Sequence, residues 1–389
     1  MQVKQIYGLV NDTVAEVLGK ESDLLTEDLS NVVDVGNSIL NAGTDNYVKS
    51  LINRIGKTII VSKDYQGKTL GLLKDGFEYG CILQKIRINM PDASENEAWK
   101  LNNGTSYDFT VFYGASVKQS FWQQKSTFEI DMSIAEDQVK ESFVSANALT
   151  SFVAAIYQAM ANKMSLALEN LAQRVVNMAI AETLYDLSST GDYTGAGNTR
   201  AINVLKLYND KFNKSLTTAD ALFDADFIRY TAWLMGEYKD RLAKMSELFN
   251  LDGYATFTKD ARVVLWSPFK NSADTYLYSD VYHNEFVRLP NCETVAYWQG
   301  VGDDFDLDIT GTILCKDSAG HEIEGPDAIL GVMFDNEALA ICNENQRTTS
   351  AFNPKGEFTN VFEKSDMSAY FDKAENFVVF YCADASANA

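Results

Sequence analysis

The chain has 389 residues, 46% of them hydrophobic, so it is long enough to bury a large core. It carries 54 acidic residues against 33 basic ones, which gives a formal net charge of −21. This balance argues against a primary role in gripping nucleic acid, because phosphate binding needs clusters of Lys and Arg. A protein that encloses nucleic acid remains compatible, since an acidic wall repels DNA and lets it slide. Simple solubility explains the charge equally well.

The cysteines and the N-terminal sequence indicate the cellular compartment in which the protein is expected. Five cysteines are widely spaced and form no CxxC pair: Cys81, Cys292, Cys315, Cys342 and Cys382. This pattern predicts buried free thiols in a reducing compartment rather than a zinc or redox site. The N-terminus lacks the apolar core of a signal peptide, and no apolar run approaches the roughly 18 residues of a membrane helix. We therefore expect a protein of a cytoplasm, or of a particle assembled there.

The N-terminal segments are short and mixed. Apolar residues at helical spacing predict an amphipathic helix over residues 3–18. Residues 19–45 are polar and mixed, which is typical of an arm rather than a core. We expect a short helix at Tyr47–Ile55 and a strand at Thr58–Ser62.

The next stretch predicts a hairpin with two different faces. Apolar side chains occupy one face of its first strand and polar ones the other: Ile82, Ile86, Ile88 and Met90, with Gln84, against Lys85, Arg87 and Asn89. A polar tip follows at Pro91–Ser106, and we expect the chain to return through residues 107–113, with a third extended run at Ser126–Met132. Two strands alone are marginal in water, so the apolar face must be covered by something else.

The strongest signal is one long amphipathic helix from about Ser145 to Leu187. Its apolar positions recur at steps of three and four: Leu149, Phe152, Val153, Ile156, Met160, Met164, Leu168, Leu171, Val175, Met178 and Ile180. The polar side is expected to hold Gln158, Asn162, Glu169, Gln173 and Asn177. A helix of about 40 residues is roughly 60 Å long, against about 10–14 residues in a typical globular helix. A rod beside a hairpin favours a subunit that reaches its neighbours over an enzyme.

Two further helices and several strands are expected around this rod. The sequence Ser133-Ile134-Ala135-Glu136 has the pattern of a capping box and predicts a short helix to about Phe143. The Gly-rich residues 191–200 predict a connector. A helix is expected at Thr218–Phe249, with its buried face made by Leu222, Phe227, Tyr230, Leu234, Tyr238, Leu242, Met245 and Leu248. Short strands are expected at Ala261–Trp266, Phe286–Leu289, Glu293–Tyr297, Phe305–Thr312, Ile329–Phe334 and Phe377–Cys382.

No catalytic, cofactor-binding or metal site is predicted. His283 and His321 are the only histidines, and neither has a paired carboxylate at a useful spacing. The segments GAGNTR and GVGDDF lack the nucleotide-binding patterns. The acidic group Asp303, Asp304, Asp306 and Asp308 fails the calcium-loop pattern, since Ile309 and Cys315 stand where Gly and Glu are required. Its alternation with apolar residues favours a half-buried strand with an acidic outer face.

An aromatic group and a group of methionines could each be interpreted as a functional site, but a structural role is favoured for both. Phe121 and Trp122, next to Lys118 and Lys125, have the composition of a base-stacking site, but packing on a strand is favoured in an acidic chain. The methionines of the long helix are favoured as core residues over a cofactor site: Met160, Met164 and Met178.

The chain resembles the major capsid protein of tailed bacteriophages, and locally the major head protein of small short-tailed phages. Four segments carry the resemblance: LINRIGKTIIV (51–61), FTVFYGASVKQSFWQQKSTFEI (109–130), VKESFVSANALTSFVAAIYQAM (139–160) and ILGVMFDNEALAI (329–341). The order of arm, hairpin, long helix and mixed region is also similar. The resemblance covers about 50–190 firmly and is weaker beyond.

The resemblance implies an α+β chain with the Johnson fold, which encapsulin shells share. It implies five parts: an N-terminal arm (1–50), an extended loop with flanking strands (51–132), a peripheral domain with a long spine helix (133–205), an axial domain (206–345) and a return to the peripheral domain (346–389). It further implies hexamers and pentamers that form an icosahedral or prolate head around double-stranded DNA, bound without sequence specificity. A separate scaffolding protein, a portal and head-completion proteins are the implied partners, with assembly in the host bacterial cytoplasm and no membrane.

Two alternatives remain open on the sequence. An encapsulin-type compartment would hold a protein cargo and no nucleic acid. A cytoplasmic enzyme with an unrecognised site would form a small oligomer and lose its activity on one substitution.

Overall fold

The computed structural model describes residues 3–18, 31–42, 46–52, 72–74, 83–88, 110, 114, 117–122, 125–278, 292–296, 298, 313–317 and 319–384. Several predicted features lie outside these residues: Cys81, His283, the hairpin tip, the Asp303–Asp308 group, and the strands expected at 58–62, 286–289 and 305–312. The chain divides into two compact units. The first comprises Met1–Cys81, Gln124–Ala172 and Ile341–Ala369, and the second comprises Ile82–Gln123, Gln173–Ala340 and Tyr370–Ala389.

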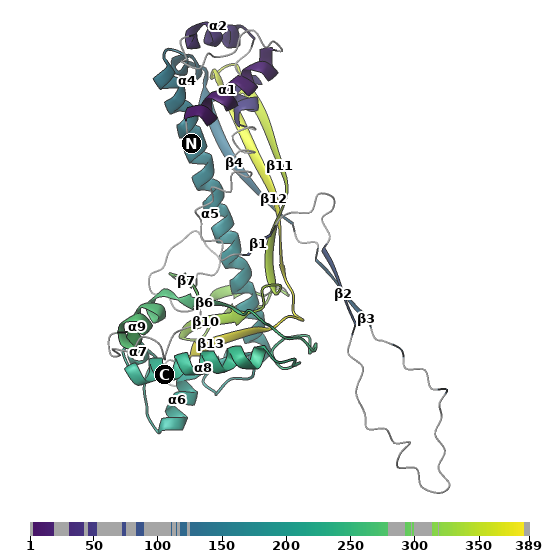
Figure 1. The fold of residues 1–389 in the computed structure, drawn as a ribbon, viewed down its shortest axis with the longest axis vertical. Coiled ribbons are helices and arrows are strands. Elements are labelled where there is room, and N and C mark those ends of the chain that lie inside the picture. Colours follow the sequence, from purple (N-terminus) through teal and green to yellow (C-terminus); the bar gives the residue numbers. More distant parts are fainter. Residues whose placement is uncertain are drawn as a thin grey trace. The chain divides into compact units, whose positions relative to one another are not determined.

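The first unit combines helices with a four-stranded sheet. Its strands are β1 (Leu73–Lys74), β4 (Lys125–Ala135), β11 (Leu339–Asn353) and β12 (Phe358–Phe371), in the order β1-β11-β12-β4. The long strands β11, β12 and β4 run side by side (Figure 1), and β12 pairs with β4 in antiparallel register from Phe358↔Ala135 to Ser368↔Lys125. The sequence predicted the extended run that became β4, but it missed β11 and β12.

Helices cover the apolar side of this sheet. They are α1 (Val3–Leu18), α2 (Val32–Ala42), α4 (Glu136–Ser142) and the first part of α5 (Ala146–Leu187), with residues 46–52 also helical. Val10 and Val14 of α1 and Val35 and Ile39 of α2 are buried in one cluster with residues of α5, including Val153. The expectation that residues 19–45 stay outside a core is therefore wrong for α2, whose apolar face is part of this core.

The long helix α5 begins where the sequence predicted, because the Ser145 hydroxyl accepts the amide of Ala148 at 3.2 Å. It has 42 residues. One buried stripe runs along its first part, as expected, and includes Met160 and Met164. The later part departs from the prediction, because α5 is buried on almost every side within the second unit. Asn177, expected on the polar face, is 1% exposed there.

The expected capping box does not start α4. Strand β4 continues through Ser133 to Ala135 because its ladder with β12 is unbroken there. The Ser133 hydroxyl therefore donates to Asn360 Oδ1 at 2.6 Å across the two strands instead of capping a helix. Helix α4 begins at Glu136, and the Gln138 side chain accepts the Ala135 amide at 3.1 Å.

The second unit is built on a five-stranded sheet. Its strands are β5 (Ala201–Asn203), β6 (Arg262–Trp266), β7 (Glu293–Val295), β10 (Ala328–Phe334) and β13 (Phe377–Cys382), in the order β5-β13-β10-β6-β7. Every residue of β10 and β13 is buried. Four of the predicted strands appear here at nearly the predicted bounds. Gly331 permits close approach of β10 and β6, because a Cβ atom there would lie 2.6 Å from Leu265 Cδ2.

The described part of the second unit also contains helices and two-stranded sheets. The helices are α6 (Val204–Phe212), α7 (Thr218–Ala221), α8 (Ala225–Leu242) and α9 (Ser267–Tyr278). The sheets pair β8 (Leu314–Lys316) with β9 (Glu322–Glu324), and β2 (Leu83–Ile88) with β3 (Val117–Trp122). The helix expected at Thr218–Phe249 is broken, because the Asp224 carboxylate accepts the Phe227 amide at 2.7 Å and starts α8 anew. Since α8 ends at Leu242, Met245 and Leu248 are exposed rather than buried.

Candidate functional site

The described residues that could carry conventional site chemistry make structural contacts. The His321 ring stacks on Tyr185 at 4.3 Å between ring centroids, and its Nδ1 lies 2.7 Å from Asp317 Oδ2, which are structural contacts on an exposed side chain. Across the described residues, no group of three or more His, Cys, Asp or Glu is arranged to hold a metal ion. The described helices include none that combines the length and apolar character needed to cross a membrane. Cys342 and Cys382 are buried free thiols, as predicted, and Cys292 is half-buried.

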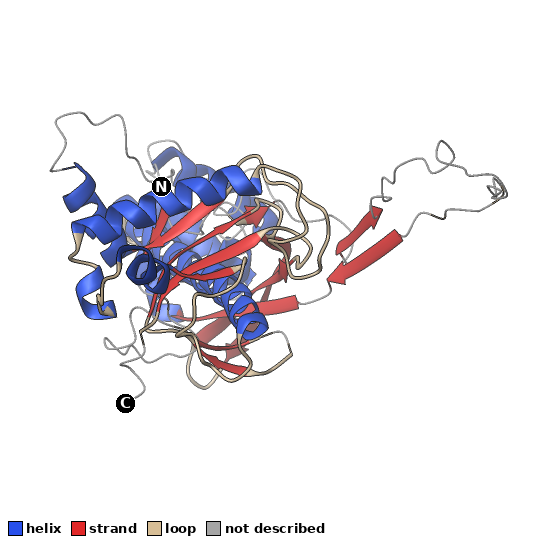
Figure 2. Cartoon of the chain, turned by 90° about the horizontal axis from the view of Figure 1, so that it is seen from below, coloured by secondary structure: helices blue, strands red, loops and turns tan. Residues whose placement is uncertain are grey.

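The feature that stands out is the hairpin β2–β3. Its strands pair antiparallel from Leu83↔Trp122 to Ile88↔Val117, and among the described strands they pair only with each other (Figure 2). Because side chains opposite one another point the same way, this register defines two faces. The charged face holds Lys85, Arg87, Lys118, Ser120 and Trp122. The apolar face holds Ile86, Ile88, Val117 and Phe121, with Gln119.

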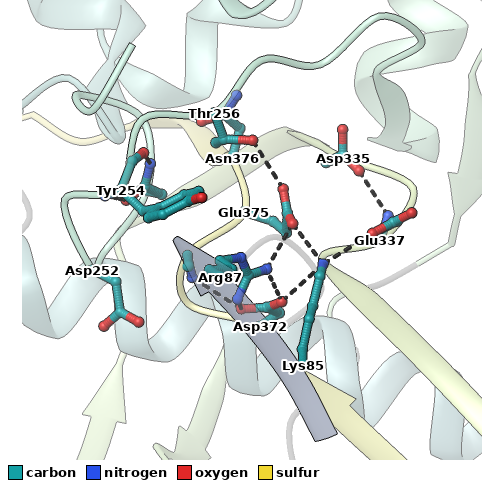
Figure 3. Close-up of polar contacts among 12 residues, drawn as sticks. Lys85, Arg87, Asp252, Tyr254, Thr256, Asp335, Glu337, Asp372, Glu375 and Asn376 are labelled. Atoms are coloured by element: carbon teal, nitrogen blue, oxygen red, sulfur yellow. Dashed lines mark hydrogen bonds and ion pairs between the residues drawn. The ribbon is translucent and has the colours of Figure 1, made fainter. Parts of the chain in front are cut away.

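The charged face is turned toward the rest of the second unit, to which the hairpin itself belongs. Arg87 forms a two-pronged contact with Asp372, in which Nη1 lies 3.1 Å from Oδ1 and Nη2 contacts Oδ2. Arg87 Nη2 also donates to Glu375 Oε1 at 2.7 Å. Lys85 Nζ lies 2.6 Å from Glu375 Oε1, 2.9 Å from Glu337 Oε2 and 3.2 Å from Asp372 Oδ2. Figure 3 shows both cations projecting from one side of β2 toward these carboxylates.

These charges are largely removed from water. Arg87, Asp372 and Glu375 are 7%, 1% and 9% exposed. Burial alone would lower the pKa of Lys85, but its hydrogen bonds to Glu375 and Glu337 and the attraction of Asp372 outweigh burial and raise that pKa. Burial alone would likewise lower the pKa of Arg87, but its hydrogen bonds to Asp372 and Glu375 outweigh burial and raise that pKa. Both side chains therefore remain cations throughout the physiological pH range.

Further contacts fix the rim of the hairpin. Lys118 stands opposite Arg87 in the ladder, and like charges opposite one another repel, but Lys118 Nζ pairs with Asp252 at 2.9 Å. The Tyr254 ring lies 5.5 Å from the Arg87 guanidinium, and its hydroxyl donates to the Ile88 carbonyl at 2.9 Å. Trp122 Nε1 donates to the Phe371 carbonyl at 3.1 Å. Both strands of the charged face therefore contact the rest of the second unit, and the exposed Lys118–Asp252 pair, with side chains 46% and 28% exposed, contributes little to holding it.

The apolar face is left open to solvent. Ile86 is 58% exposed, Ile88 59%, Val117 53% and Phe121 59%. Four large exposed apolar side chains on one face of a two-stranded ribbon mark an interaction surface, since isolated exposed apolar residues are common but grouped ones are not. We call these four residues the open face of the hairpin.

The sequence predicted part of this site. It placed Ile86 and Ile88 on one face of β2 and Lys85 and Arg87 on the other, and the structure confirms both. The return strand expected at residues 107–113 lies outside the described residues apart from Thr110, and the described strand that pairs with β2 is β3. Phe121 and Trp122 do lie on a strand, as favoured, with Phe121 exposed and Trp122 half-buried.

The acidic partners of the site were missed. Asp372, Glu375 and Glu337 lie far from β2 in the sequence and carry no motif. One signal was available: a strand that places Lys and Arg on one face needs carboxylates to oppose them. The turn Asp372-Lys373-Ala374-Glu375 supplies two within four residues.

Comparisons with known proteins point in one direction. The sequence profile of the family described as Phi29-like phage major capsid protein matches residues 10–381. The structure is similar to a chain from "Structure of head fiber and inner core protein gp22 of native bacteriophage P68", with a TM-score of 0.50, 11% identity, and coverage of 80% of this chain and 83% of that chain. For a chain from "Capsid structure of Staphylococcus phage Andhra" the TM-score is 0.49, the identity 10%, and the coverage again 80% and 83%. No curated protein sequence matches significantly.

The mixed helix-and-sheet architecture, the family profile and the likeness to the phage P68 chain together define the class: an α+β protein with the fold of phage capsid proteins, as the sequence predicted. The chain belongs to the Phi29-like phage major capsid protein family, whose profile spans nearly its whole length. Its function is to form a capsid, and it is a component of the virion. An encapsulin-type compartment is not favoured.

Proposed function

We propose that this chain assembles into hexamers and pentamers that close into an icosahedral or prolate head around double-stranded DNA. The single observation that carries the proposal is the open face of the hairpin, which offers four large apolar side chains to a partner. In a closed shell of identical subunits the partner is a second copy, and each contact is repeated throughout the particle. A modest free energy per contact is then sufficient for a stable shell.

The five-part division expected from the sequence belongs to this proposal. Residues 51–132 are the extended loop, and the hairpin β2–β3 lies within it. Residues 133–205 form the peripheral domain with α5 as its spine, residues 206–345 the axial domain, residues 1–50 the arm, and residues 346–389 the return to the peripheral domain. The burial of α1 and α2 in the core of the first unit supports an arm that is docked rather than free.

The proposed role is structural and not catalytic. The net charge of −21 supports a DNA-facing wall that does not adhere to its contents or read their sequence. We further propose a separate scaffolding protein, a portal and head-completion proteins as partners, and assembly in the cytoplasm of the bacterial host.

The direct test is particle formation. The chain is expressed with and without the scaffolding protein encoded beside it, and the products are examined by negative-stain electron microscopy and sedimentation. Closed shells built of six- and five-fold clusters are expected. In infected cells, nuclease-protected double-stranded DNA inside the particles is the second expected result. A small soluble oligomer under both conditions, or particles with a protein cargo and no DNA, would contradict the proposal.

A further inference from the structure

The two faces of the hairpin are placed opposite to the usual arrangement. When one side of an antiparallel ribbon packs on a protein, the apolar side normally faces the protein and the charged side faces water. Here Arg87 is 7% exposed, whereas its neighbours Ile86 and Ile88 are 58% and 59% exposed. Hydrophobic burial within the subunit would favour the reverse orientation, so another interaction must select the observed one.

The buried carboxylates supply that selection. Asp372 Oδ1 accepts the Ala374 amide at 3.1 Å, and Glu375 Oε2 accepts the Thr256 hydroxyl at 3.2 Å, so both acids are fixed within the second unit by contacts other than the hairpin. If the hairpin turned its apolar face inward, both carboxylates would lose Arg87 and Lys85. A buried charge without its counterion costs far more than the solvent exposure of an apolar side chain.

The same contacts also select the register of the strands. A slip of β2 by one residue would move Lys85 and Arg87 to the outer face and bring Ile86 inward, because successive side chains alternate. The forked guanidinium of Arg87 reaches both oxygens of Asp372, which a shifted strand would not allow (Figure 3).

We propose that Lys85, Arg87, Asp372 and Glu375 form an orientation lock, which fixes the face of the hairpin that a neighbouring subunit meets. These four residues are positioning residues: they control assembly through the hairpin and do not contact the neighbour. The inference rests on the proposed function, in which the open face is an assembly contact. It adds that the buried ion pairs determine which face of the hairpin points outward, and that they contribute less to the free energy of unfolding of the subunit.

The test separates presentation from stability. Buried ion pairs can often be replaced by apolar residues without loss of stability, so the fourfold variant Lys85→Met, Arg87→Met, Asp372→Leu and Glu375→Leu is expected to melt near the temperature of the native subunit. Hydroxyl-radical footprinting of the unassembled subunit then reports which face is outside. Assembly is followed by light scattering. Lys118→Met, which removes the rim ion pair with Asp252, is the matched control.

The lock predicts that the fourfold variant folds, that footprinting of the open face falls, and that assembly slows by about tenfold or more, as for the loss of one well-oriented contact per interface. Lys118→Met is expected to change neither readout. A fourfold variant that is footprinted and assembles like the native protein would overturn the lock. If the fourfold variant does not fold, Arg87→Met is judged by the same two readouts.

A variant of the open face distinguishes the two proposals. If Phe121→Ser abolishes assembly while the fourfold variant assembles normally, the lock fails and the assembly contact stands. If Phe121→Ser assembles normally, the assembly role of the open face fails, and the lock has no bearing on assembly.

Discussion

Replacing Phe121 by Ser tests the open face without disturbing the subunit that carries it. Phe121 is 59% exposed. A Phe side chain presents roughly 200 Å², so about 120 Å² is available to a neighbour, worth about 3 kcal/mol at about 25 cal/mol per Å². Ordering and imperfect fit at the interface offset part of this, leaving about 1–2 kcal/mol per contact, or roughly a 5- to 30-fold loss of affinity.

The assay is the subunit concentration at which half of the protein sediments as particles. We expect that concentration to rise by about tenfold or more for Phe121→Ser, because every interface of the shell carries the same loss. The melting temperature of the unassembled subunit should hardly change, since exposed substitutions usually alter the free energy of unfolding by less than about 0.5 kcal/mol. Gln119→Ser is the matched control on the same face. Assembly of Phe121→Ser at the native concentration would show that the open face is not a subunit contact.

Three further predictions concern the subunit itself. Ile156, which is 6% exposed in the stripe of α5, should not tolerate Asp, and Ile156→Asp should cost about 4 kcal/mol or more and give insoluble protein; a soluble variant with normal circular dichroism would refute the assigned stripe. Gly331→Ala should lower the melting temperature through a clash with Leu265, at a cost of about 1–3 kcal/mol, and unchanged melting would mean that β10 and β6 are less tightly packed than described. Burial raises the pKa of Tyr193 to about 12. Its folded form keeps a proton that the unfolded chain releases near pH 10, so this stabilisation is full below about pH 10 and is lost as the pH rises toward about 12. Tyr193→Phe should flatten that part of the curve of unfolding free energy against pH, and an unaltered curve would exclude the assigned environment.

Local patterns were sufficient for the elements whose signals are local. The helix α5 was predicted within one residue of its observed bounds, because apolar residues recur at helical spacing over that whole length and no proline interrupts them. The two-faced character of β2 was also readable, since period-two alternation is a direct consequence of strand geometry. The buried strands β10 and β13 were predicted for a similar reason: each is a short apolar run bounded by polar residues.

The remaining features depend on contacts distant in the sequence. Asn177 lies on the polar side of α5 by spacing, yet the second unit encloses it. Helix α7 ends at Ala221, and Asp224 caps the new helix α8 by accepting the Phe227 amide, although the apolar spacing continues across both positions. The orientation of the hairpin depends on Asp372 and Glu375, whose burial no local pattern reveals. The sequence therefore showed that β2 has two faces but not which one meets water.

The distance in sequence between Arg87 and Asp372 also determines how long after the hairpin its acidic partners are synthesised. They are separated by 285 residues, which a ribosome translating at about 5–20 residues per second covers in roughly 15–60 s. Throughout that interval the nascent chain carries the hairpin without the acids that orient it. Under the proposed lock, a chain still being translated cannot hold the open face of its hairpin outward. Only copies synthesised past residue 375 are therefore competent to join a growing shell.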